Sequence, residues 1–176
     1  MERWFVLFVR TSMEVAAVDY LKSQLDFSKY QPFVLTKEFF FWDKGIPVLF
    51  KKLLFPSYVI VKTSCESTVV LADLKPILKN HRDVIYKILA YDNSECKNIM
   101  LYKSEQTMWA SLVDSDFCIT ASEGKLDDGK LKIISGPLLG KEHRLKTVNK
   151  YKRKAIIDVE FAGELIEISV ALKLSK

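Results

Sequence analysis

The sequence predicts an α+β protein, in which a domain of helices packed on a sheet is followed by a small β-barrel. In the first two thirds of the chain, segments with apolar residues at helical spacing alternate with short runs of β-branched and aromatic residues. The last third holds only strand-like runs, about ten residues apart. The 176 residues suffice for two small domains. We expect the first domain over residues 1–116, a polar linker over 117–127 and the second domain over 128–176.

The first domain is predicted to contain one mainly antiparallel sheet. Asp43, Lys44 and Gly45 are residue types of a tight turn, so the segments on either side of them are expected to form a hairpin. The aromatic run Phe39–Trp42 beside this turn is interpreted as packing of the core or of the hairpin. Runs rich in Val, Ile and aromatic residues indicate strands over residues 4–11, 31–42, 47–54, 58–62 and 84–91.

Three segments of the first domain show the spacing of an amphipathic helix. Thr11 and Glu14 have the T-x-x-E spacing of a capping box, which would satisfy free amides at the start of the first helix. Pro76 is expected to bend the second helix or end it early. Ser104 is expected to cap the third. The predicted helices cover residues 15–25, 67–78 and 105–113, and bury Val15, Val18, Leu21, Leu25, Val70, Leu71, Leu74, Ile77, Leu78, Met108 and Leu112.

The second domain is predicted to be a small barrel or sandwich. Its strands are expected over residues 131–134, 145–148, 155–161 and 165–170. Apolar and polar residues alternate in the last two of these strands, and Ala162-Gly163 is suited to the tight turn between them. A fold-switching barrel would have a helical ground state in this segment. The alternation of apolar and polar residues argues against that possibility.

Positive charge is concentrated in one part of the second domain. The whole chain has a net charge of +5, yet residues 141–154 alone carry seven Lys and Arg residues against one acid, Glu142. Such a segment creates a positive field that a polyanion such as a nucleic acid can use. The charges alone are equally compatible with a solvated loop that keeps the protein soluble.

Several function classes find no support in the sequence. No apolar run reaches the roughly 18–20 residues of a membrane span, and the apolar start of the chain is too short for a signal-peptide core. We therefore expect a cytoplasmic protein that does not contact membranes. No C-x-x-C pair, histidine cluster or catalytic constellation is visible, so we expect neither enzymatic activity nor a metal or other cofactor. The few residues of these types are Cys65, Cys96, Cys118, His81 and His143.

Two motifs in the expected order resemble those of one protein family. Residues 54–61, Leu-Phe-Pro-Ser-Tyr-Val-Ile-Val, are similar to the F-P-G-Y-V-x-V strand of NusG-type transcription elongation factors. Residues 133–142 are similar to the G-P-x-x-G-x-E loop of the KOW module in that family, and residues 148–155 to its I-D-R-H-K-R-x-A segment. The opening Trp4-Phe5-Val6-Leu7 also fits, so the resemblance covers nearly the whole chain.

The resemblance implies a fold and a first partner. The fold would be the α/β sandwich of the NusG amino-terminal domain, followed by a five-stranded KOW barrel. The first domain would hold the clamp helices of the largest subunit of bacterial RNA polymerase, and would contact the non-template DNA strand. By position in the motifs, the polymerase-binding residues would be Trp4, Phe55, Pro56 and Tyr58. Taken without the resemblance, Trp4 and Phe55 are ordinary core aromatics.

The second domain most resembles that of the specialised LoaP-type antiterminators. This resemblance implies that a monomeric protein binds a hairpin in nascent RNA. Basic side chains would neutralise phosphates and Tyr151 would stack on a base, although Tyr151 is equally suited to the rim of the barrel. The expected RNA-binding residues are Lys141, Arg144, Lys146, Lys150, Tyr151, Lys152, Arg153 and Lys154.

Two alternatives remain open. The chain could be a general NusG-type elongation or pausing factor, whose KOW domain contacts a ribosomal protein or the termination factor Rho. It could also be a ribosome-associated or RNA-binding KOW protein that does not bind polymerase. Three departures from the family pattern favour a divergent member: Ser57 replaces a glycine, residues 80–84 replace a P-G-V turn, and His143 replaces the second glycine of the KOW loop.

Overall fold

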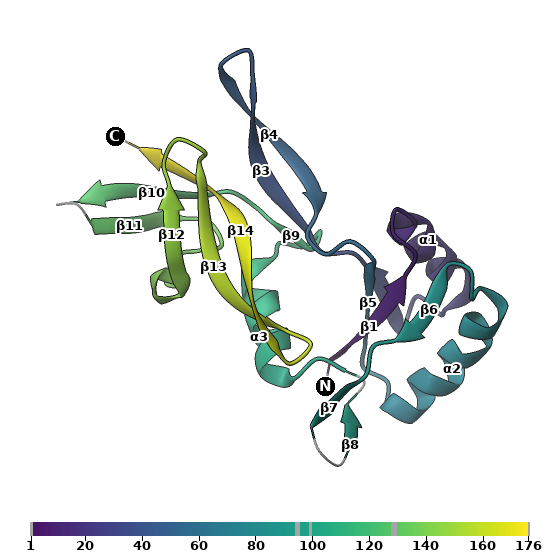
Figure 1. Ribbon diagram of the computed structural model, residues 1–176. Coiled ribbons are helices and arrows are strands. Elements are labelled where there is room, and N and C mark those ends of the chain that lie inside the picture. Colours follow the sequence, from purple (N-terminus) through teal and green to yellow (C-terminus); the bar gives the residue numbers. More distant parts are fainter. Residues whose placement is uncertain (1, 94–95, 99, 128–129, 176) are drawn as a thin grey trace. The chain divides into compact units, whose positions relative to one another are not determined.

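The computed structural model describes residues 2–93, 96–98, 100–127 and 130–175. Within these ranges the chain is a mixed α/β protein with three α-helices and several separate sheets (Figure 1). It divides into two compact units, and each unit is assembled from two pieces of the chain. Unit 1 comprises Met1–Leu35 and Leu54–Gln106, and unit 2 comprises Thr36–Leu53 and Thr107–Lys176.

Unit 1 is built on a four-stranded sheet with the strand order β2-β5-β1-β6. The central pair, β1 and β5, is antiparallel, and Phe8 lies opposite Tyr58. The predicted strand over residues 31–42 is in fact two strands, because the chain leaves this sheet after Phe33. The strands are β1 (Arg3–Val9), β2 (Tyr30–Phe33), β5 (Tyr58–Thr63) and β6 (Ile85–Ile88), and a separate hairpin pairs β7 (Tyr91–Asn93) with β8 (Cys96–Asn98).

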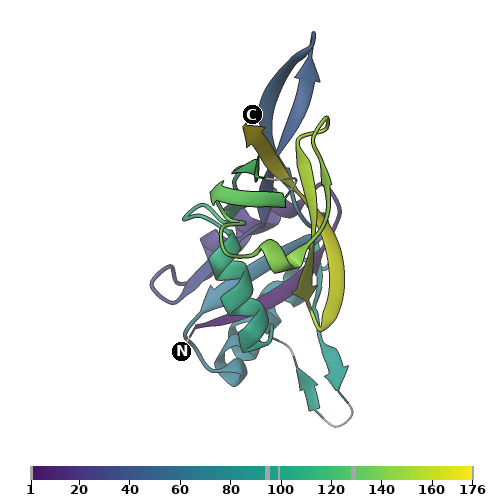
Figure 2. The ribbon, with the colours of Figure 1, turned by 90° about the vertical axis from the view of Figure 1, so that its left-hand side faces the viewer.

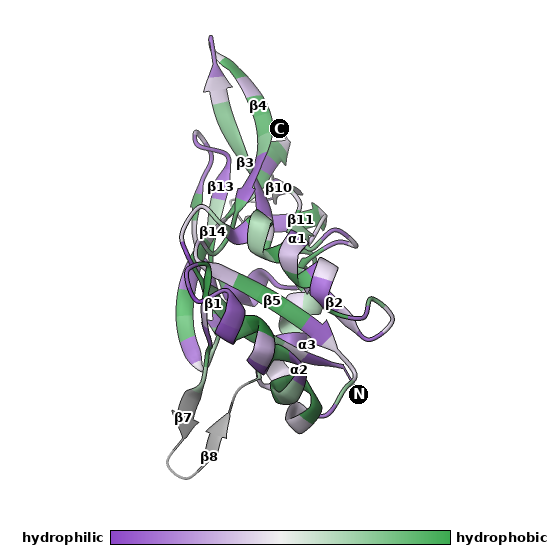
Figure 3. Ribbon diagram, turned by 90° about the vertical axis from the view of Figure 1, so that its right-hand side faces the viewer, coloured by the Kyte–Doolittle hydropathy of each residue, from purple (hydrophilic) through white to green (hydrophobic). Residues whose placement is uncertain are grey.

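Helices α1 (Glu14–Gln24) and α2 (Ser67–Asn80) cover one face of this sheet. Apolar residues of both helices and of the sheet form one core, and Figure 3 shows the apolar central part of β5 in green. Three expectations about the helices were wrong. Val15 and Leu71 are 60% and 41% exposed, although both were expected to be buried. Helix α2 does not end early at Pro76 but continues to Asn80, and Leu74 and Ile77 on either side of the proline are both packed in the core.

The Thr11–Glu14 spacing does not form the expected capping box. Helix α1 begins at Glu14 with no side-chain cap. The Glu14 carboxylate instead accepts hydrogen bonds from the backbone amides of Ser57, at 2.6 Å, and Ser12, at 3.2 Å. Thr11 Oγ1 lies 2.7 Å from Ser57 Oγ. Ser57 adopts the left-handed conformation with a φ of 70°, which glycine adopts more readily than serine.

Hairpin β3–β4 belongs to unit 2, although residues 36–53 were expected in the first domain. Strands β3 (Thr36–Asp43) and β4 (Ile46–Leu53) are antiparallel, and the predicted turn joins them at Lys44 and Gly45, both with positive φ. The other edge of β3 pairs in parallel with β9 (Cys118–Ile119). This pairing, which involves Thr36 and Lys37 at the start of β3, connects the hairpin to the C-terminal strands of unit 2.

The rest of unit 2 is a five-stranded sheet with the strand order β11-β10-β14-β13-β12. Strands β10 and β14 are parallel, and the other neighbours are antiparallel. The long strands β13 and β14 are yellow-green and yellow in Figure 2. The segment 117–127, expected to be a linker, holds β9 and β10. The strands are β10 (Ser122–Asp127), β11 (Lys130–Ser135), β12 (Leu145–Asn149), β13 (Lys154–Phe161) and β14 (Glu164–Ser175).

The predicted alternation in the last two strands is confirmed. Ile157, Val159 and Phe161 are buried, and Ala162 and Gly163 form the turn with positive φ values of 54° and 81°. Helix α3 (Lys103–Leu112) supplies Trp109, whose Nε1 donates a hydrogen bond to the Glu160 carbonyl at 2.9 Å. Met108 and Leu112 are buried as expected, but Ser104 is the second residue of the helix and not its cap.

The loop that follows β11 requires glycine at position 136. Gly136 has a φ of 89°, and a Cβ there would lie 2.6 Å from the Ser122 Cα. His143, which replaces the second glycine of the family pattern, lies in the short 3-10 helix η1 (Glu142–Arg144). Its φ is not in the left-handed region. The departure at His143 is therefore compatible with the backbone of this loop.

Candidate nucleic-acid interface

The four residues predicted to bind polymerase lie in unit 1 but not in a single cluster. Trp4 and Tyr58 project from the face of the sheet opposite to α1 and α2. Trp4 is 3% exposed, and its ring packs edge-to-face on Phe33 at a centroid distance of 5.2 Å. Trp4 and Phe8, the β1 neighbour of Tyr58, are four residues apart, which separates them by about 13 Å along the strand.

Tyr58 belongs to a row of three aromatic rings across β5, β1 and β6. Its ring lies 5.7 Å from that of Phe8, which in turn lies 5.5 Å from that of Tyr86. Phe55 and Pro56 occupy the turn that leads into β5, where Phe55 is half-buried and Pro56 is exposed. The partly exposed aromatic surface is thus formed by Phe8, Tyr58 and Tyr86, and only Tyr58 of these was predicted.

The eight predicted RNA-binding residues separate into two groups in unit 2. The first group is engaged with its own neighbours. Lys146 forms ion pairs with Glu167 at 2.9 Å and with Asp158 at 3.1 Å, and these partners raise its pKa. Lys141 Nζ donates to the Pro137 carbonyl, and Arg144 donates to the Asp158 carbonyl. These three cations are less available to a polyanion than their sequence position suggests.

The second group forms the turn between β12 and β13 and the first residue of β13. Tyr151 is 90% exposed at the tip of this turn. The turn is held by the Asn149 side chain, whose Oδ1 accepts the Lys152 amide at 2.8 Å. Arg153 adopts a left-handed backbone conformation with a φ of 47°. We name this group the basic turn; it comprises Lys150, Tyr151, Lys152, Arg153 and Lys154.

The aromatic run of β3 lies against the basic turn. The Arg153 guanidinium carbon lies 5.3 Å from the centre of the Phe40 ring and 5.6 Å from that of Trp42. Both distances are within the range of cation–π attraction. The sequence alone suggested only a packing role for this run and did not place it in the site. The signal was present, because four consecutive aromatic residues in a segment rich in lysine are unusual for a buried strand.

Another lysine of the hairpin is buried beside the basic turn. Lys37 is 8% exposed, and its ammonium donates to the carbonyl of Ser169 at 2.7 Å and to the Ser169 hydroxyl at 3.1 Å. Burial, and then the positive charges of Lys52 and Lys154, lower the pKa of Lys37 to about 8. Three lysines from distant parts of the sequence therefore share one electropositive region.

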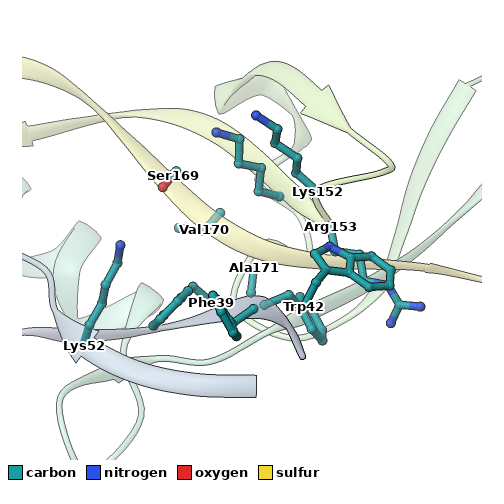
Figure 4. A pocket seen from close by; sticks show the side chains of 11 residues that line it. Phe39, Trp42, Lys52, Lys152, Arg153, Ser169, Val170 and Ala171 are labelled. Carbon is teal, nitrogen blue, oxygen red and sulfur yellow. The ribbon is translucent and has the colours of Figure 1, made fainter. Parts of the chain in front are cut away.

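A pocket of about 400 Å³ lies between hairpin β3–β4 and strands β13 and β14 (Figure 4). Lys52 lies on the hairpin side of this pocket and Lys152 on the side of the basic turn. None of the described residues that line the pocket has a carboxylate. Its aromatic and basic lining includes Phe39, Phe41, Trp42, Lys52, Arg153 and Lys154, and its floor includes Ser169, Val170 and Ala171.

Comparison with known proteins does not assign a function to this chain. The sequence matches the model of no known protein family, and it matches no curated protein. In the part of the chain that the structure describes, no helix has both the length and the apolar character needed to cross a membrane. The features that bear on function are therefore the aromatic row of unit 1 and the aromatic and basic pocket of unit 2.

Proposed function

We propose that this protein is a NusG-type transcription factor that acts as a processive antiterminator. Its first domain would bind bacterial RNA polymerase, and its second would bind nascent RNA. The observation that carries the proposal is the basic turn, which exposes Lys150, Tyr151 and Lys152 and holds Arg153 beside the rings of Phe40 and Trp42 in β3. The two sequence motifs that resemble the NusG family support the same reading.

The chemistry of the basic turn suits RNA. Lysine and arginine side chains neutralise phosphates and release counterions, which favours binding of any nucleic acid. Aromatic rings add stacking surface for unpaired bases, which RNA loops and single strands present. Tyr151 and Trp42 are 90% and 45% exposed, so both retain ring surface for such contacts. A solvated loop would need the charges but not these rings.

The aromatic row of unit 1 suits a protein partner. Phe8, Tyr58 and Tyr86 offer large apolar area with few rotatable bonds, and binding energy at protein interfaces concentrates in such residues. The clamp helices of polymerase are the partner that the family resemblance implies. A factor that binds polymerase with a closed clamp more tightly than polymerase with an open clamp would increase the population of the closed, elongating state. This effect needs no covalent chemistry by the factor.

Binding to a polymerase fragment tests the first half of the proposal. The fragment would contain the clamp helices of the largest subunit of a bacterial RNA polymerase. Replacement Tyr58→Ala should weaken binding by about 2 kcal/mol, the usual loss at an interface anchor. Phe27→Ala is the matched control, because Phe27 is an exposed aromatic residue of the same unit outside the row. Equal binding by wild type and Tyr58→Ala would refute this site.

Titration with RNA at several salt concentrations tests the second half. The double variant Lys152→Ala/Arg153→Ala should lose affinity for an RNA hairpin and show a shallower dependence on salt. The control Lys125→Ala/Lys132→Ala removes two exposed cations of β10 and β11. Equal losses of RNA affinity in both double variants would show that the basic turn contributes only nonspecific charge. The alternative of a general elongation factor whose second domain binds a protein would then be preferred.

A further inference from the structure

We propose that the pocket between hairpin β3–β4 and strands β13 and β14 binds a single unpaired nucleotide, with its phosphate among the lysines and its base against Trp42. The inference rests on the proposed RNA-binding function and names the part of the RNA that is recognised. It also makes the hairpin, which precedes β13 by about 100 residues, part of the same RNA site.

The charges of the pocket favour a phosphate. The lining contributes four cations, Lys52, Lys152, Arg153 and Lys154, and no lining carboxylate among the described residues offsets them. In the same described ranges, none of the four forms an ion pair, in contrast to Lys146. Like charges held together repel each other, and a bound anion relieves this repulsion. The ammonium of Lys37, beneath Ser169, adds to the same field.

The rings and the floor of the pocket favour an unpaired base. Phe41 is 54% exposed, and its ring is held edge-to-face by Phe50 at 6.2 Å. The Arg153 guanidinium carbon lies 5.6 Å from the centre of the Trp42 ring, and Trp42 is 45% exposed, so part of this side chain remains accessible to a base. Val170 and Ala171 give an apolar floor. A paired base within a duplex has both of its faces covered by stacked neighbours, so only an unpaired base can enter such a site.

The size and the rigidity of the pocket agree with one nucleotide. A volume of about 400 Å³ is within the range for small ligands and far too small for a helix of RNA. Lys52 Nζ lies 4.6 Å from the centre of the Phe39 ring, which positions its charge at the wall before any ligand binds. The short turn that carries Lys152 is fixed by Asn149. The site is therefore largely formed in the unbound protein.

The test compares a short oligouridine with a blunt RNA duplex of equal nucleotide count, using the full chain. We expect the oligouridine to bind more tightly than the duplex, and Lys52→Gln/Lys154→Gln to weaken oligouridine binding about 10- to 100-fold. The control Lys125→Gln/Lys132→Gln should change it less than about threefold. Circular dichroism of both double variants should match that of wild type.

Tryptophan fluorescence gives a second readout that does not need the lysine variants. The sequence contains three tryptophans; Trp4 and Trp109 are buried, and Trp42 is 45% exposed. A base that stacks in the pocket should quench the emission of Trp42, and Trp42→Phe should abolish the quenching while oligouridine still binds. Quenching that persists in Trp42→Phe would overturn the inference.

The outcomes separate this inference from the proposed function. Equal affinity for oligouridine and duplex, with no effect of the pocket variants, would refute the nucleotide site but leave RNA binding by the basic turn in place. Failure of the full chain to bind either RNA would refute both. Quenching by free uridine monophosphate, together with no loss of oligouridine binding in the pocket variants, would also count against the inference, because the site would then recognise a free nucleotide and not an RNA strand.

Discussion

Replacement of Glu14 by glutamine should destabilise unit 1 and remove part of its sensitivity to acid. The Glu14 side chain is buried at the start of α1, and one of its oxygens accepts two backbone amides, those of Ser57 and Ser12. Ser57 is held in the left-handed conformation, which costs a non-glycine residue about 1–3 kcal/mol. The Glu14 carboxylate thus fixes the turn that contains Phe55, Pro56 and Ser57.

The size of the effect follows from the two hydrogen bonds. A hydrogen bond to a charged group contributes about 1.5–3 kcal/mol, against about 0.5–1.5 kcal/mol between neutral groups. Glutamine keeps an acceptor oxygen but loses the charge, so each bond weakens by about 1 kcal/mol. The bond to Ser12 is long, at 3.2 Å, and contributes less than the bond to Ser57 at 2.6 Å. We expect Glu14→Gln to lower the free energy of unfolding by about 1–2 kcal/mol at pH 7.

The dependence on pH gives the assay its specificity. Burial raises the pKa of Glu14, but the amides of Ser57, Ser12 and Glu14 itself outweigh burial and hold the pKa below its ordinary value of 4.5. A lowered pKa contributes stability above the ordinary value, and this stability is lost as the pH falls through the folded-state pKa. Urea denaturation at pH 7 and in steps down to about pH 2 should therefore show the gap between wild type and Glu14→Gln closing.

A matched substitution on the same helix controls for the general effect of removing an acid. Asp19 is exposed on α1, so Asp19→Asn should change stability by less than about 0.5 kcal/mol at any pH. The reasoning would be refuted if Glu14→Gln and Asp19→Asn behaved alike at pH 7. It would also be refuted if the gap between Glu14→Gln and wild type stayed constant in acid, because the lost contribution would then not come from the carboxylate charge.

Three further substitutions probe unit 2. Trp109→Phe should lower its stability by about 2–3 kcal/mol in urea denaturation, because the Glu160 carbonyl loses its donor and a cavity remains beside Phe161; a loss below about 0.5 kcal/mol would contradict this packing. Gly136→Ala should cost about 2–5 kcal/mol in the same assay, since its Cβ would meet the Ser122 backbone at 2.6 Å and its φ is 89°, and a neutral result would contradict the loop conformation. The pKa of Lys37 is lowered from 10.5 to about 8 in the folded state, so between these pH values the unfolded state binds more protons than the folded state. Wild type should therefore gain stability relative to Lys37→Met in urea denaturation as the pH rises from 8 to 10.5. Parallel pH profiles of the two proteins would contradict the burial of this ammonium.

Patterns of short range made much of the fold predictable from the sequence. The alternation of apolar and polar residues predicted β13 and β14, and turn residues predicted the hairpins β3–β4 and β13–β14, because these features depend on neighbours in the chain. The same logic failed where a residue's partner was distant. The T-x-x-E spacing predicted a cap within α1, whereas the partner of Glu14 is Ser57, 43 residues away.

The site was only partly predictable for the same reason. The basic segment was visible as charge, but the sequence could not show that Asp158 and Glu167 engage Lys146 and leave the basic turn as the available part. It also could not show that the aromatic run of β3 faces Arg153, because that contact joins residues more than 100 positions apart. The run was therefore assigned to packing.

The central claim, that one protein joins polymerase to RNA, is tested most directly by assembling the three components. The full chain, the clamp-helix fragment and a labelled RNA hairpin would be mixed and separated by size-exclusion chromatography. We predict a single species that contains all three components. The Tyr58→Ala variant should lose the fragment but keep the RNA, and Lys152→Ala/Arg153→Ala should lose the RNA but keep the fragment. A species with RNA but never with the fragment would contradict the claim and identify an RNA-binding protein that acts apart from polymerase.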